Sequence, residues 1–98
     1  MSLPTSAKRH LRSLAHHLDP AVRVGGAGVT AAVIHQVDMA LARELIKVRV
    51  DGDRTEVAAA ATALAEGARA EVAQVIGKVI VLFRPAAKRD QRKIILPE

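Results

Sequence analysis

A run of five large apolar residues, Val79 to Phe83 (VIVLF), constrains the fold more than any other segment of the chain. Successive side chains of a β-strand point to opposite faces of the sheet. A strand without polar side chains must therefore be covered on both faces, as happens inside a layered α/β domain. We expect this strand inside a sheet, and we expect Pro85 to end it.

The residues before this run predict a second strand paired with it. Val72 to Ile76 is mostly apolar, and Gly77-Lys78 follows directly. Glycine at the first central position is typical of a two-residue hairpin turn. The two segments are therefore expected to form an antiparallel hairpin.

Two earlier strands are expected at 21–24 and 45–50. In Leu45 to Val50 (LIKVRV) apolar and basic residues alternate, so Lys47 and Arg49 should occupy a basic, solvent-facing side. A helical segment separates these two strands, which indicates a parallel pair joined by a right-handed crossover. With the hairpin, they make a mixed four-stranded sheet.

Three helices are expected from apolar residues at helical spacing. The first is capped by Thr5 or Ser6 and ended by Asp19-Pro20, and its stripe is Leu11, Leu14, Ala15 and Leu18. The second begins after Thr30, with an apolar face of Val33, Ile34, Val37, Ala40 and Leu41. The third is capped by Thr55 and has a left-handed cap near Gly67; its inward residues are Val57, Ala60, Ala61, Leu64 and Ala68.

The element order is helix, strand, helix, strand, helix, strand, strand, which predicts a compact α/β domain. The 98 residues suffice for one domain, 1–98, with a basic C-terminal tail at 85–98. The tail ends in Ile94, Ile95 and Leu96, which are candidates to dock on the domain.

Composition argues against several classes of protein. The chain has no cysteine, so disulfides, thiolate nucleophiles and cysteine-based zinc sites are excluded. Its four histidines form no H-E-x-x-H pattern, and its serines lie outside any nucleophile elbow, so we expect no metal, no cofactor and no enzyme. Without an apolar stretch typical of a signal peptide or a membrane span, we expect a soluble, cytoplasmic protein.

The positive charge is concentrated at the two ends of the chain. The net charge is +5, and residues 1–23 hold four basic residues against one acidic residue. Residues 85–98 hold four against two, whereas residues 24–84 are balanced at seven of each. Clustered positive charge is typical of a partner that is a polyanion, although a basic surface can also serve solubility alone.

Three glycines lie between the first expected strand and the second helix. Gly25, Gly26, Ala27 and Gly28 (GGAG) follow Arg23-Val24 and precede Thr30. Glycines here allow positive φ and leave backbone amides uncovered at a helix N-terminus, which suits a phosphate oxygen. GxxG loops clamp RNA backbones in this way in some RNA-binding modules. A tight turn that needs small residues is the alternative; the P-loop and dinucleotide patterns are absent.

Several segments together resemble the YhbY-like proteins, which consist of a single CRM domain (chloroplast RNA splicing and ribosome maturation). These segments are KRHLRSLAHHLDPAVRVGGAGVT, ELIKVRV and QVIGKVIVLFRP, in that order. The resemblance implies a fold similar to the C-terminal domain of translation initiation factor three, with an added N-terminal helix. It also implies RNA binding, with ribosomal RNA in precursors of the large subunit as the bacterial partner.

The resemblance assigns the RNA contact to the GxxG loop and to nearby basic residues. Related loops often carry a basic or polar residue between the outer glycines, where this chain has Gly26 and Ala27. The positive charge must therefore come from outside the loop. The candidates are Arg23, Lys8, Arg9, Arg12, Lys47 and Arg49, followed by Lys78 and Arg84.

The single aromatic residue, Phe83, is expected in the core, which leaves no platform for stacked bases. Binding should depend on phosphate contacts and on the shape of the RNA, with little sequence specificity. Two alternatives stay open at this point. One is a protein-interaction adaptor that docks through its apolar tail, and the other is a basic DNA-binding protein. The sequence does not define an oligomeric state.

Overall fold

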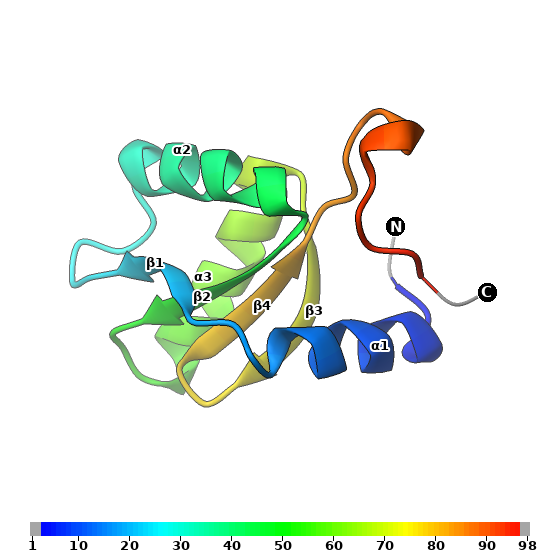
Figure 1. The fold of residues 1–98 in the computed structure, drawn as a ribbon. Helices are drawn as coiled ribbons and strands as arrows, with labels where there is room; N and C mark the ends of the chain where they lie inside the picture. Colours follow the sequence, from blue (N-terminus) through cyan, green and yellow to red (C-terminus); the bar gives the residue numbers. More distant parts are fainter. Residues whose placement is uncertain (1–2, 97–98) are drawn as a thin grey trace.

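The computed structural model describes residues 3–96 as three helices packed on one four-stranded sheet (Figure 1). The expected α/β fold class and element order are confirmed. The elements are α1 (Thr5–Ala15), β1 (Pro20–Val24), α2 (Ala31–Ala40), β2 (Leu45–Val50), α3 (Arg54–Ala68), β3 (Glu71–Ile76) and β4 (Val79–Phe83), with short 3₁₀ turns η1 (Leu41–Arg43) and η2 (Arg89–Gln91).

The strands are ordered β1-β2-β4-β3 in the sheet. β1 and β2 are parallel, as the helical connection predicted, and Arg23 pairs with Arg49 in their register. β4 is antiparallel to both β2 and β3, which confirms the hairpin. Gly77 in the turn has φ +55°, a conformation that favours glycine. The glycine loop, the 51–53 turn and the hairpin turn therefore lie at one end of the sheet.

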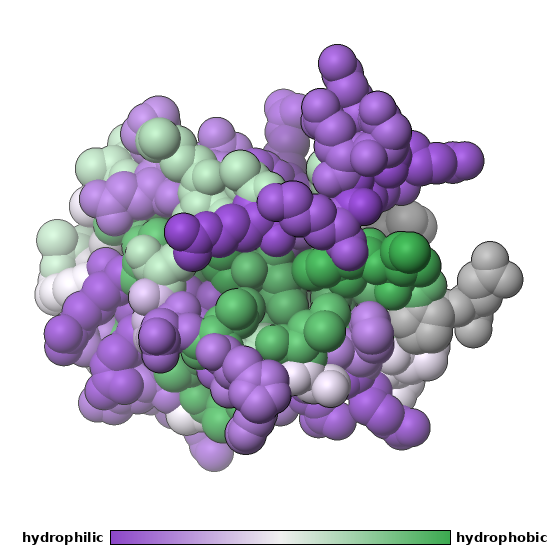
Figure 2. Space-filling model, viewed as in Figure 1, coloured by the Kyte–Doolittle hydropathy of each residue, from purple (hydrophilic) through white to green (hydrophobic). Residues whose placement is uncertain are grey.

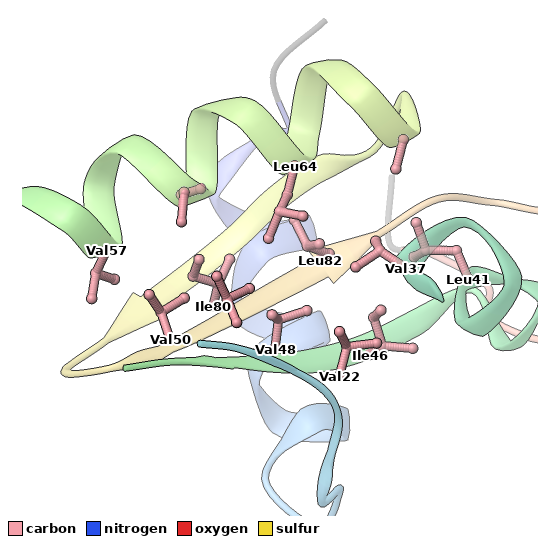
Figure 3. Close-up of a cluster of buried hydrophobic side chains, with 14 residues drawn as sticks. Val22, Val37, Leu41, Ile46, Val48, Val50, Val57, Leu64, Ile80 and Leu82 are labelled. Carbon is pink, nitrogen blue, oxygen red and sulfur yellow. The ribbon is translucent and has the colours of Figure 1, made fainter. Parts of the chain in front are cut away.

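The larger core lies between the sheet and the helices α2 and α3 (Figure 3). Val48, Ile80 and Leu82 of the sheet meet Val37 of α2 and Leu64 of α3, and all five are fully buried. Each such side chain contributes roughly 1.5–3 kcal/mol relative to an exposed position. All five expected inward residues of α3 are buried, as predicted.

The second core lies on the opposite face, under α1. Leu11 and Ala15 of α1 pack with Leu45, Val81 and Phe83 of the sheet. β4 therefore contributes alternate side chains to the two cores, as its apolar run predicted.

The contact face of α1 differs from the expected stripe. The buried residues are Ala7, Leu11 and Ala15, whereas Leu14 and Leu18 are 40% and 37% exposed. The helix also ends at Ala15, four residues before Asp19, so Leu18 lies outside it. Residues spaced by four lie on one helix face, and alanine at two of the three contacts lets α1 lie close to the sheet.

The first residues of the helices confirm one expected N-cap and correct two. Thr30 accepts a hydrogen bond from Val33 N at 3.2 Å, as expected. For α1, neither Thr5 nor Ser6 provides a side-chain cap, because the helix already includes both residues and Pro4 occupies the cap position. For α3, Asp53 and Glu56 form a reciprocal capping box, so Thr55 is not the cap.

The C-terminal end of α3 also differs from the expectation. The residue with left-handed geometry is Arg69, with φ +55°, and Gly67 lies inside the helix. A Cβ at Gly67 would lie 2.7 Å from Ile34 Cδ1. Position 67 therefore requires glycine because α2 packs closely against it, and not because the helix ends there.

The C-terminal segment is held by a buried carboxylate, that of Glu44, which is 1% exposed. Its oxygens accept hydrogen bonds from the backbone amides of Ala86 (3.1 Å), Ile94 (3.2 Å) and Lys93. Burial alone would raise the pKa of Glu44, but the three amide donors outweigh it, so the pKa lies below its usual value. Ile94 and Leu96 pack on the core under α1, while Ile95 is 83% exposed.

Candidate nucleic-acid interface

The glycine loop, residues 25–28, projects from the end of the sheet between β1 and α2 (Figure 1). The amide of Gly28 donates to Gly25 O at 3.0 Å, and Gly28 has φ +76°. A Cβ added to Gly25, Gly26 or Gly28 would meet no atom within 4 Å. The positive φ of the turn thus explains why position 28 is a glycine. Neither close packing nor a positive φ explains why positions 25 and 26 are glycines.

Gly26 and Ala27, in the middle of this loop, are exposed. Within residues 3–96, no acceptor takes a hydrogen bond from the amides of Gly26 and Ala27. The following helix adds the free amides of its first turn and a partial positive charge. The loop can therefore offer main-chain donors to an anion without losing any internal hydrogen bond.

Arg23 lies beside the loop and is bound to Asp51. Arg23 Nε lies 2.7 Å from Asp51 Oδ2, and Nη2 lies 3.0 Å from Oδ1. This two-bonded pair lowers the pKa of Asp51 and raises the pKa of Arg23. Arg49 Nε lies 3.9 Å from the same carboxylate, and the charge of Lys78 also lowers its pKa. Three cations thus surround one carboxylate, which leaves the cluster positive.

The sheet face opposite α2 and α3 carries basic side chains of β1 and β2. Arg23, Lys47 and Arg49 are on this face, since the residues that alternate with them, such as Val22 and Val48, are in the α2–α3 core. The expected basic side of β2 is therefore present. It is only partly open, because α1 crosses it and half buries Lys47.

Between α1 and the sheet lies a groove of about 490 Å³. Arg9 and Arg12 line it from α1, and Lys47 lines it from β2. His16 and His17, which follow the helix, line it as well, although the sequence did not place them at the site. The Lys and Arg residues of the groove and those near the glycine loop together form what we call the basic face. Its members are Arg9, Arg12, Arg23, Lys47, Arg49 and Lys78.

The structure separates two candidate residues from the basic face. Lys8 lies on the other side of α1, in a hollow with Thr62 and Glu66 of α3. Arg84 follows β4 at the opposite end of the sheet from the glycine loop. Its guanidinium donates to Asp38 Oδ1 at 2.6 Å and to Ala68 O at 2.8 Å, and the pair lowers the pKa of Asp38. Arg84 thus joins α2 and α3 to the end of the sheet.

Hydrophilic side chains border an apolar area in the middle of the side seen in Figure 2. No group of three or more His, Asp or Glu side chains within residues 3–96 is arranged to hold a metal ion. None of the helices in that range is long and apolar enough to span a bilayer. What the site offers chemically is hydrogen-bond donors and positive charge.

Fold and site together define a small α/β domain with one cationic face that ends at an open glycine loop. Residues 3–84 match the CRS1/YhbY (CRM) domain family, and the chain belongs to this family. The resemblance seen in the sequence is therefore confirmed. The C-terminal segment held by Glu44 lies beyond the family match.

Relatives from several organisms share this domain. An "RNA-binding protein" of Haemophilus influenzae is 41% identical over 98% of this chain and 96% of its own length. "Probable RNA-binding protein YqeI" of Bacillus subtilis is 44% identical, over 92% and 94% respectively. A Staphylococcus aureus protein with a solution structure, described as "a putative RNA binding protein", superposes with a TM-score of 0.83 at 40% identity, covering 97% of this chain and 99% of that one.

Proposed function

We propose that this chain binds structured RNA by its phosphate backbone, using the glycine loop and the basic face. The observation that carries the proposal is the position of the amides of Gly26 and Ala27, which have no hydrogen-bond partner within residues 3–96, beside the cluster of Arg23, Arg49 and Lys78. Amides at a helix N-terminus bind phosphate oxygens directly, and the nearby cations supply the long-range attraction. The family and the names of the relatives agree with RNA as the partner.

The proposed binding mode follows from the lack of exposed Phe, Tyr and Trp side chains. Phe83 is the single aromatic residue of the chain except for histidines, and it is 2% exposed. A sheet-surface platform for stacked bases is therefore not available on this domain. Recognition through phosphates and helix shape gives strong salt dependence and weak sequence dependence.

We propose ribosomal RNA in precursors of the large ribosomal subunit as the partner, and subunit assembly as the process. The family resemblance supports this choice, and the basic face suits an RNA with many closely spaced phosphates. The adaptor alternative loses its docking element, because Ile94 and Leu96 pack on the domain itself and leave only Ile95 strongly exposed. No observation favours DNA over RNA, so the experiment must compare them.

The test is a salt titration with two competitors. Affinity for a ribosomal RNA fragment is measured between 50 and 200 mM salt, against A-form RNA and B-form DNA duplexes. With six phosphate contacts, affinity should fall by about three orders of magnitude over this range. A-form RNA should compete better than DNA. Salt-independent association, or stronger competition by DNA, would contradict the proposal. Sedimentation with immature large subunits in a ribosome gradient tests the proposed partner.

A further inference from the structure

The groove between α1 and the sheet has a chemistry that phosphate binding alone does not explain. Its rim carries Arg9, Arg12 and Lys47, and no Asp or Glu lines it. Apolar side chains form its floor: Ile76 is 55% exposed there, and Ala15 and Val81 lie beneath the surface, almost fully buried. A phosphate needs only the cations, because an apolar surface gives it no hydrogen bonds.

One side chain of the groove is suited to reading a base edge. Gln74 of β3 lies opposite Val81 and points to the α1 side of the sheet, half-buried. Its amide can donate and accept, and no partner for it is found within residues 3–96. Next to it, Ile76 is 55% exposed although it is large and apolar. An amide beside an apolar surface matches the polar edge and the flat face of a nucleobase.

The mouth of the groove adds histidine rings. His16 and His17 line it and meet edge to face, with ring centroids 5.2 Å apart. Histidine is among the side chains on which unstacked RNA bases stack. The volume of about 490 Å³ lies in the range of about 300–1,000 Å³ typical of small-ligand sites.

We propose that this groove holds one unpaired nucleotide of the bound RNA, such as a bulged or looped-out residue. The base lies on the exposed side chain of Ile76 with its edge at Gln74, and its phosphate lies between Arg12 and Lys47. Lys47 and Arg49 are two residues apart on β2, so one RNA strand can follow this strand from the groove toward the glycine loop. The inference rests on the proposed RNA binding, to which it adds a preference for interrupted helices.

The experiment compares two RNA hairpins that differ only by a single bulged nucleotide. The protein should bind the bulged hairpin about tenfold more tightly than the fully paired one. Gln74→Ala and Ser13→Leu, which fills the groove from exposed Ser13 of α1, should each abolish this preference. Both variants should retain the affinity for the paired hairpin. Ser6→Leu, at an exposed position of α1 outside the groove, is the matched control.

The possible results distinguish failure of the proposed nucleotide site from failure of RNA binding as a whole. Equal affinity for the two hairpins, or an unchanged preference in both groove variants, would overturn the nucleotide site and leave the proposed function standing. Absence of salt-dependent binding to either hairpin would overturn both. Circular dichroism melting shows whether each variant is folded before its affinity is compared.

Discussion

Arg23 donates two hydrogen bonds to Asp51, the carboxylate that also lies 3.9 Å from Arg49. The pair holds Arg23 at the base of the glycine loop, on the strand pair β1–β2. It also neutralises part of the positive charge in the proposed RNA-binding site. Binding of a phosphate at Arg23 must therefore compete with Asp51.

Replacing this carboxylate should strengthen RNA binding. In Asp51→Asn, the site gains one net positive charge and Arg23 is released, so affinity at about 0.1 M salt should rise severalfold. The salt slope should also become steeper. Asp90→Asn makes the same change of charge at an exposed position in the C-terminal segment, at the other end of the molecule, and should have a smaller effect. Equal effects of the two variants would show that only total charge matters.

Single cations of the basic face should contribute separately to the salt dependence. Arg49→Ala removes one phosphate contact, so the slope of log affinity against log salt should decrease by about one. Arg43→Ala removes the same charge from an exposed position at the opposite end of β2 and serves as the control. A slope that is unchanged in Arg49→Ala would place the RNA elsewhere.

The buried carboxylate of Glu44 should stabilise the fold and order the C-terminal segment. Glu44→Ala leaves the amides of Ala86, Lys93 and Ile94 without their acceptor, so unfolding free energy should decrease by about 3 kcal/mol or more. Glu44→Gln keeps one acceptor oxygen and should lie between this variant and the wild type. Hydrogen exchange at the three amides should accelerate in the same order. Unchanged exchange in Glu44→Ala would contradict the role of this side chain.

The same carboxylate makes stability depend on pH. The folded-state pKa of Glu44 lies below its unfolded value of about 4.3, so its stabilising contribution is fully present above that value. The contribution is lost as the pH falls from about 4.3 through the lower folded pKa. Melting temperature from pH 7 to pH 2 should therefore fall less steeply in Glu44→Gln than in the wild type. Parallel curves for the two proteins would refute this assignment.

Periodicity in the sequence predicted the buried faces of β4 and α3, but not the contact face of α1. The apolar run of β4 required cover on both faces, and the inward residues of α3 followed from their spacing. Helix ends were less predictable, because several neighbouring polar residues can cap and the backbone geometry selects one. Asp53 was selected over Thr55 in this way.

The arrangement of the candidate site was predictable only in part. The loop follows from its three glycines, and the face occupied by the strand residues Lys47 and Arg49 follows from alternation. Lys8 and Arg84 do not join them, because the rotation of a helix and the far end of a strand depend on tertiary packing. Glu44 carries no sequence pattern at all: a lone glutamate before a strand resembles a surface charge.

The proposed RNA contact of the glycine loop can be tested by one substitution within it. Gly26 has an ordinary φ and open space at its Cβ position, so Gly26→Leu should fold normally, unlike substitutions of Gly28 at φ +76°. Affinity of Gly26→Leu for a ribosomal RNA fragment is the decisive measurement, with Ala87→Leu in the exposed C-terminal segment as control. We predict a loss of at least about tenfold in Gly26→Leu, equivalent to about 1.4 kcal/mol, and wild-type affinity in the control. Wild-type affinity in a folded Gly26→Leu protein would contradict the proposed role of the loop.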